Sequence, residues 1–292
     1  MAFHSTRSNA LRLMRSNLTE QQWEGNTKAV EKLKLQIKNH SLASHPAISS
    51  LQSEKYSLNS IKQIHLEYRH AIVQIFTDAL LMAQLQSRQL EPRLTFGAKM
   101  GPRCLLTLNI LDEFGFAPGV GEDGYYLGNP SLAHYPLFED VLKRLGISEA
   151  EIKYFNPSGI SNQVREFLES SFTDYLSILV LLAVAEEQVI LFSQPLRQTL
   201  VNLKIDTDVG YYVVHGTTDD KTLNASDDQH EDDLWYALIH GCTASDFERI
   251  TSLALRYCDL WNEFWTYQYA SSRNFMRNDR ISCPSNEAAC IE

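Results

Sequence analysis

Two glutamates of this chain lie in segments whose other residues are typical of buried helices. Glu113 shares a predicted helical face with Leu106 and Ile110, and Glu186 directly follows the apolar run 178–185. Because an isolated carboxylate is strongly disfavoured in an apolar core, each glutamate requires a partner that compensates its charge. A metal ion is one such partner, and carboxylates can bridge two ions.

Three histidines and an aspartate could complete such a site. His134 opens another predicted helix, His215 and His230 flank an acidic stretch, and Asp227 stands three residues before His230. Residues three apart on a helix share a face, so Asp227 and His230 can reach the same ion. Iron and manganese accept mixed carboxylate and imidazole shells. The residues therefore predict a dinuclear site with two iron ions, or manganese in their place, and with positions left for O2 and a substrate.

Each of these residues also has a simpler interpretation. Glu187 is adjacent to Glu186, and one of the two is expected to face inward. A single histidine at a helix start, such as His134, is more often structural than a ligand. The acids between residues 219 and 233 are by default a solvated face that stabilises a helix N-terminus.

A competing metal motif is present in Glu67-Tyr-Arg-His70, which matches the Glu-x-x-His element of ferritin-like bundles. A ferritin-like site needs two such elements and the chain has one, so we assign Glu67 and His70 to a pocket wall or the surface. Nucleophilic catalysis is not indicated, because the chain has no G-x-S-x-G motif and no cysteine in an activating context.

Helices must position these residues, and the apolar spacing of three and four residues predicts an all-α protein. We expect an N-terminal extension over 1–40, a helical domain over 41–272 and a disordered tail over 273–292. The Gly-rich stretch 116–124 is expected to be a loop. The predicted helices cover about 59–86, 102–114, 134–145, a short segment from Ser148, 162–194 ended by Pro195, 226–240 and 244–269.

Composition restricts the class of protein. The formal charge of −10 opposes binding to a nucleic acid. The longest apolar run, 178–185, is far shorter than the roughly 20 residues that cross a bilayer, so we expect a soluble, cytoplasmic chain without a membrane partner. The five cysteines show no CxxC spacing and are expected to be reduced thiols.

Taken in order, the motifs resemble those of the haem-oxygenase-like di-iron oxidases, in particular their CADD-like members, over about residues 45–265. The family pattern is Asn-Leu-x-Asp-Glu, a His-led helix ending Leu-Gly-Val, Tyr-Glu-x-Gln, and His-x3-Asp-x2-His. The matching stretches here are 109–113, 134–147, 185–188, and 211–215 with 227–230. The resemblance implies a seven-helix TenA/PqqC-like bundle. It also implies six metal ligands, namely Glu113, His134, Glu186, His215, Asp227 and His230, of which Glu113 and Glu186 are the expected catalytic carboxylates.

The chain departs from the family pattern in two places. Several residues are inserted between His215 and His230, which leaves both Asp219 and Asp227 as candidate ligands. We favour Asp227, because Ser226 can cap a helix that contains it. The link between Glu113 and His134 is also longer than in the family.

The resemblance implies an oxygen-activating non-haem di-iron oxidase. The tyrosine and lysine of its self-sacrificing members match Ile48 and the Leu196/Arg197 region here, so an external small-molecule substrate is expected. An amino acid or a fatty acid would suit N-oxygenation, desaturation or carbon–carbon cleavage, with an external reductant, and a homodimer is a further expectation. The alternatives are a metal-free ligand-binding or protein-interaction module, and a thiaminase-like hydrolase, which would need an activated cysteine.

Overall fold

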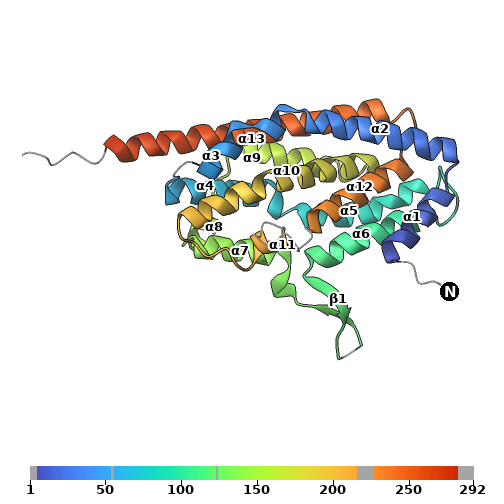
Figure 1. The fold of residues 1–292 in the computed structure, drawn as a ribbon, viewed down its shortest axis with the longest axis horizontal. Coiled ribbons are helices and arrows are strands. Elements are labelled where there is room, and N and C mark those ends of the chain that lie inside the picture. Colours follow the sequence, from blue (N-terminus) through green and yellow to red (C-terminus); the bar gives the residue numbers. More distant parts are fainter. Residues whose placement is uncertain (1–4, 54–55, 123, 216–225, 282–292) are drawn as a thin grey trace, which may run out of the picture.

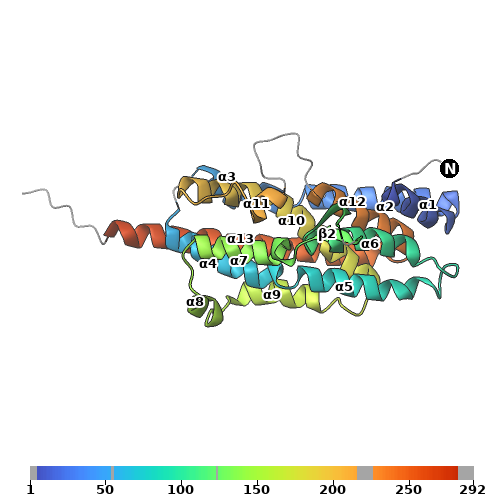
Figure 2. The same ribbon diagram turned by 90° about the horizontal axis from the view of Figure 1, so that it is seen from below.

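The computed structural model describes residues 5–53, 56–122, 124–215 and 226–281, with the backbone alone for 226–230 and 274–281. It is an elongated bundle of helices, seen from two directions in Figures 1 and 2. The predicted all-α class is confirmed.

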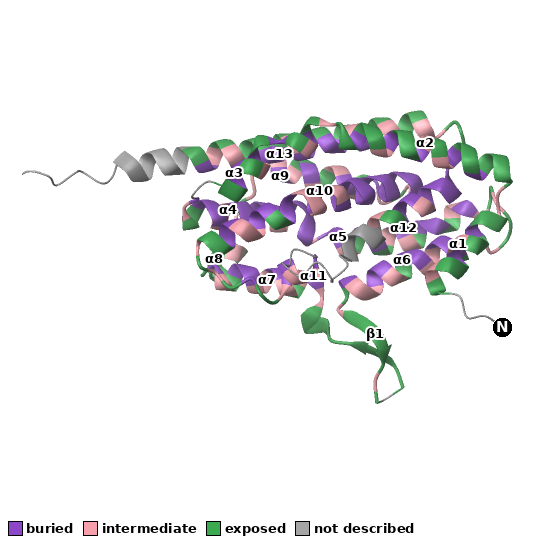
Figure 3. Ribbon diagram, viewed as in Figure 1, coloured by how far each residue is buried: buried purple, intermediate pink, exposed green. Residues whose placement is uncertain are grey.

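The helix α10 (Tyr175–Asn202) is the centre of the bundle. Every residue from Tyr175 to Glu186 is buried. Four helices pack around it, namely α3 (Pro46–Ser53), α5 (Phe76–Gln86), α12 (Ser226–Gly241) and α13 (Phe247–Ile281). Its N-cap Asp174 accepts a hydrogen bond from the backbone N–H of Ser177 at 2.8 Å. Among the described residues α10 is the one helix long and apolar enough to cross a membrane, but 83% of its most apolar window is buried by other helices. Figure 3 shows it as a buried core element.

The prediction that Pro195 ends this helix is wrong, as is the single helix predicted over 162–194. The chain forms α9 (Gly159–Glu169), turns at 170–174, and then continues in α10 through Pro195 to Asn202. A proline inside a helix costs about 3 kcal/mol. Burial of Leu196, Thr199 and Leu200 beyond the proline offsets this cost.

The predicted helices over 102–114, 134–145 and 226–240 agree with helices of the structure to within a few residues at their ends. The remaining helices are η1 (Ser41–Ser44), α4 (Leu58–Tyr68), η2 (Arg69–Val73), η3 (Ser87–Leu90), α6 (Met100–Glu113), η4 (Pro130–Leu132), α7 (His134–Arg144), α8 (Glu149–Lys153) and α11 (Tyr211–Val214).

The predicted N-terminal extension folds as two helices that lie along the bundle, α1 (Thr6–Ser16) and α2 (Glu20–Lys38). Thr19 and Gln22 form a capping box that starts α2. The helix then buries Trp23, Val30 and Leu33 against α12 and α13. At the other end of the chain, α13 continues to Ile281, beyond residue 272 where we expected the helical domain to end. The last part of the predicted tail, 282–292, lies outside the described residues.

The segment 59–86, expected as one helix, is interrupted in its middle. The π-helical turn η2 separates α4 from α5, and the N–H of Gln74 donates to the carbonyl of Arg69, five residues earlier, at 3.1 Å. Such turns are rare and frequently occur at functional sites.

A β-hairpin stands where we predicted a loop. Its strands β1 (Phe116–Val120) and β2 (Tyr126–Gly128) are antiparallel, exposed on both faces, and project from the bundle beside α6 and α7 (Figure 1). Gly115 starts the hairpin with φ of 79°, and a Cβ at this position would lie 2.5 Å from the carbonyl oxygen of Asn129. Only glycine fits this turn.

His65 is a buried histidine of α4 that is hydrogen-bonded through both ring nitrogens. Its Nδ1 lies 2.8 Å from the carbonyl of Ile61 and therefore donates, while its Nε2 accepts from the hydroxyl of Tyr212 at 2.8 Å. Burial lowers the pKa of His65 from 6.5 to about 4.

We expect the free energy of unfolding to fall as the pH is lowered from about 6.5 to about 4. In that window the unfolded chain binds a proton at residue 65 that the folded chain excludes, which amounts to on the order of 3 kcal/mol. Chemical denaturation at several pH values would show a smaller dependence for His65→Gln than for the unaltered protein. The same pH dependence in both proteins would contradict this assignment.

Candidate metal centre

Four of the six predicted ligands line one small cavity inside the bundle. Glu113, His134, Glu186 and His215 are 4%, 4%, 2% and 8% exposed, respectively. They come from the end of α6, the start of α7, the middle of α10 and the end of α11. The cavity measures about 20 Å³, which is room for about one water-sized molecule.

The imidazole of His134 is central among these groups. Its Nδ1 lies 2.9 Å from Oε1 of Glu113, and its Nε2 lies 3.8 Å from Oδ2 of Asp112. The ring centroids of His134 and His215 are 4.8 Å apart. His134 therefore contacts a carboxylate of α6, and its ring lies beside the imidazole at the end of α11.

The hairpin brings Glu113 and His134 together although about 20 residues separate them. The N–H of Asn129 donates to the carbonyl of Gly115 at 3.1 Å, which closes the base of the hairpin. The chain therefore returns to the end of α6 before it enters α7 at His134. The insertion that distinguishes this chain from the family pattern thus keeps the two residues adjacent.

Glu186 and Glu187 face different surroundings. Glu186 is buried and lines the cavity, whereas Glu187 lines a surface groove together with Lys34 and Lys38 of α2. Successive helical residues are rotated by about 100°. The glutamate that faces inward is Glu186.

The rest of the cavity wall is mostly apolar and aromatic. Ile72 and Val73 of η2 line it, and so do Phe76, Val189, Tyr135 and Tyr211. The sequence analysis did not identify the two tyrosines. Each had a signal, because Tyr135 follows His134 directly and Tyr211 stands four residues before His215, on the same helical face. The rings of Tyr211 and His215 are 4.2 Å apart.

The remaining candidates lie partly or wholly outside the described residues. The backbone of α12 starts at Ser226 and contains Asp227 and His230, as the capping argument predicts, but their side chains are not described. Asp219 lies in 216–225, outside the described residues. His215 is the C-cap of α11, so it is separated from α12 by this segment.

The donor set fits a metal ion of the iron type. The described lining carries two carboxylates and two imidazoles and no lysine or arginine, so a cation is the group that matches its charge. Within the described residues no three His, Cys, Asp or Glu side chains are close enough to hold an ion by themselves. Since Asp227 and His230 are not among the described side chains, the described part contains at most four of the six predicted ligands.

The competing motif of Glu67 and His70 has a structural role. Glu67 is buried, and it accepts hydrogen bonds from the backbone N–H and the hydroxyl of Ser158, both at 3.0 Å, and from the hydroxyl of Ser161. These contacts fix the start of α9. His70 is hydrogen-bonded to Asn162 of the same helix at 2.8 Å, so both residues tie η2 and α4 to α9.

Comparison with known proteins supports iron chemistry on this fold. Residues 123–262 match the model of a family described as iron-containing redox enzymes. This range contains His134, Glu186, His215, Asp227 and His230, and it leaves out Glu113. No curated protein matches the chain.

Two solved structures share the fold. A CADD-like protein of unknown function from Nostoc punctiforme PCC 73102 has 16% identity and a TM-score of 0.56, and the match covers 92% of this chain and 99% of that protein. A TenA family transcription regulator from Silicibacter sp. TM1040 has 12% identity and a TM-score of 0.52, over 82% of this chain and 96% of that protein. The resemblance predicted from the sequence is thus confirmed: this chain has the haem-oxygenase-like fold of CADD-like and TenA proteins and matches the family of iron-containing redox enzymes.

Proposed function

We propose that this protein is an O2-dependent non-haem di-iron oxidase or oxygenase acting on a small molecule. The observation that carries the proposal is the convergence of Glu113, His134, Glu186 and His215 on one buried cavity. The match of residues 123–262 to iron-containing redox enzymes supports it. Glu113, His134, Glu186, His215, Asp227 and His230 would hold the two iron ions. When bound, the ions supply the redox chemistry that activates dioxygen.

The protein's own residues set the conditions for this chemistry. The apolar wall formed by Ile72, Val73, Phe76 and Val189 keeps bulk water from the carboxylates. The contact between His134 Nδ1 and Glu113 orients the imidazole. The hydroxyl of Tyr135 accepts a hydrogen bond at 2.8 Å from Arg69, which holds this side chain at the cavity wall. A cavity of about 20 Å³ has room for about one water-sized molecule, so an organic substrate requires neighbouring side chains to move.

The substrate, the reductant and the surroundings of the enzyme belong to the proposal as well. We propose an amino acid or fatty acid substrate that undergoes N-oxygenation, desaturation or carbon–carbon cleavage, with electrons from an external reductant. We also propose a soluble, cytoplasmic homodimer without nucleic-acid or membrane partners. The formal charge of −10 supports the absence of a nucleic-acid partner.

The thiaminase-like alternative has the TenA neighbour in its favour. It requires an activated cysteine, and the described cavity lining contains none. Burial raises the pKa of Cys104, and it raises the pKa values of Cys242 and Cys258 to about 12, so these thiols stay protonated at neutral pH. Cys283 and Cys290 lie outside the described residues. A metal-free ligand-binding or protein-interaction module is the other alternative.

Metal stoichiometry tests the proposal directly. We expect anaerobic titration with Fe(II) to load two ions per chain, because six ligands suffice for a dinuclear site with open positions. Subsequent exposure to O2 should consume oxygen. Elemental analysis and an oxygen electrode provide the measurements. A well-folded protein that binds one ion or none would exclude the di-iron centre.

The ambiguous aspartate is tested by a matched pair of variants. We expect Asp227→Ala to lower iron occupancy at least tenfold, because Asp227 shares a helical turn with His230. Asp219→Ala should leave occupancy near that of the unaltered protein. The reverse result would assign the ligand to Asp219.

Glu186 and Glu187 form a second matched pair. Glu186→Ala should abolish iron loading while leaving the metal-free protein no less stable, because it removes one of two like charges buried at the cavity. Glu187→Ala should change neither property strongly. Thermal unfolding with and without Fe(II) provides the measurement. An iron-dependent stabilisation that survives in Glu186→Ala and disappears in Glu187→Ala would contradict this assignment and make Glu187 the ligand.

A further inference from the structure

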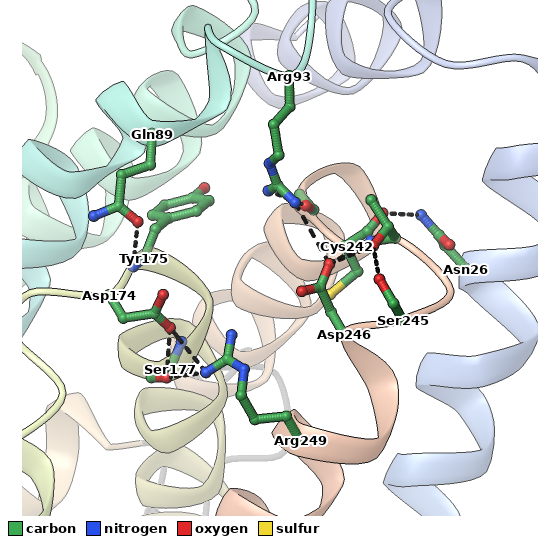
Figure 4. A network of polar contacts seen from close by, with 12 residues as sticks. Asn26, Gln89, Arg93, Asp174, Tyr175, Ser177, Cys242, Ser245, Asp246 and Arg249 are labelled. Carbon is green, nitrogen blue, oxygen red and sulfur yellow. Dashed lines mark hydrogen bonds and ion pairs between the residues drawn. The ribbon is translucent and has the colours of Figure 1, made fainter.

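A second cavity, of about 590 Å³, lies between α2 and the turn that joins α12 to α13. It shares no residue with the metal centre. Figure 4 shows the polar contacts around it, with Asn26 approaching from α2 and Arg93 from the segment after η3. Its size suits an organic molecule of about ten or more non-hydrogen atoms.

The walls of this cavity are fixed by contacts within the chain. Nδ2 of Asn26 donates to the carbonyls of Ile239 and Cys242, both at 2.8 Å, and Nη2 of Arg93 donates to the carbonyl of Gly241 at 2.6 Å. The helix α2 is therefore held against the end of α12 without any ligand. The cavity is preformed, which lowers the entropic cost of binding.

His240 is an unusual residue in this wall. It is 1% exposed, and neither of its ring nitrogens has a hydrogen-bond partner within the described part of the chain. Leaving a buried polar group unsatisfied costs about 1–3 kcal/mol. A neutral imidazole has one donor and one acceptor, so it can bond to a polar group of a bound molecule.

Gly25 of α2 lies at the edge of this cavity. It lies inside α2, where glycine destabilises a helix by about 0.5–1 kcal/mol relative to alanine. A Cβ at this position would meet no atom within 4 Å, and the residue lines the cavity. Gly25 is exposed, so packing within the fold does not require glycine here, and a larger side chain at this position has room to extend over the cavity.

The charge of the lining indicates what kind of molecule fits. Arg93 is the sole charged residue among the described residues that line the cavity, in a chain of formal charge −10. Asp246 lies 3.4 Å from Nη1 of Arg93, but its carboxylate also accepts hydrogen bonds from the N–H and the hydroxyl of Thr243. The guanidinium keeps N–H groups for a further acceptor. Leu94 and Phe247 add apolar surface.

We propose that this cavity is a binding site for a small amphipathic carboxylate. The carboxylate accepts hydrogen bonds from Arg93, the apolar body packs between Leu94 and Phe247, and a polar group of the ligand faces His240. The site is separate from the metal centre, and its occupation does not depend on iron.

The test uses the full-length protein without metal and two probes, phenylacetate and octanoate, with phenylacetamide as the neutral control. We expect at least one of the two carboxylates to bind with a Kd on the order of 1 mM or tighter. The amide should bind at least tenfold more weakly than phenylacetate. The ring resonances of His240, assigned by comparison with His240→Gln in histidine-labelled protein, should shift on binding. Failure of both carboxylates to bind at 10 mM would overturn the proposal.

A matched pair of variants locates the binding. Gly25→Leu should weaken binding at least tenfold without lowering the melting temperature, because leucine favours the helix and fills the cavity. Glu24→Leu adds the same side chain to the same helix at an exposed residue outside the cavity lining, and should leave binding unchanged. Arg93→Gln should also weaken binding at least tenfold.

Glu186→Gln, at the metal centre, should have no effect on the carboxylate. Binding that survives in Gly25→Leu and disappears in Glu186→Gln would place the carboxylate at the metal centre and overturn the proposal. Since every measurement is made without iron, its result is independent of the iron stoichiometry.

Discussion

The constraint on which the rest of this structure depends is the burial of two glutamates in an apolar helical core. Glu113 and Glu186 are 4% and 2% exposed. Transferring an ionised carboxylate from water to such an interior costs several kcal/mol unless compensating groups are present. The fold provides them by bringing His134 from α7 and His215 from the end of α11 to the same cavity. The end of α6, the start of α7 and the end of α11 therefore meet at the middle of α10, where the four side chains line one cavity.

The irregular parts of the backbone are concentrated around this cavity. The π-helical turn η2 supplies Ile72 and Val73 to its wall, the hairpin after α6 returns the chain to His134, and α11 is a single short turn that ends at His215. Regular helices on their own would not place these residues together. A regular helix through 69–73 would rotate the wall residues of α5 relative to α4, and a direct link from α6 to α7 would lack the closure at Gly115 and Asn129. Departures from regular geometry are retained where a site needs them.

The contrast between regular helices and irregular backbone segments explains what the sequence could predict. Helices with apolar residues at spacings of three and four were predictable, and so was Glu186, because a carboxylate within a wholly apolar run has few structural roles. The hairpin was not, since its closure depends on the positive φ of Gly115 and on a long-range contact with Asn129. Pro195 misled the prediction, because the burial that offsets its cost is a tertiary effect. The N-terminal segment was predicted only as an extension, without helix bounds, because the many Lys, Glu and Gln residues of α2 obscure the stripe of Trp23, Val30 and Leu33.

The helix α2 forms one wall of the second cavity. The part of the chain that matches iron-containing redox enzymes starts at residue 123, so it contains His240 and the turn after α12 but not α2. By covering this turn, α2 buries His240 and contributes Asn26 and Gly25 to a cavity that the matched part of the chain could not enclose by itself. The two cavities have opposite electrostatic character, because one presents carboxylates and the other a guanidinium. In the proposed functions, a carboxylate held at Arg93 therefore does not compete with metal ions for Glu113 and Glu186.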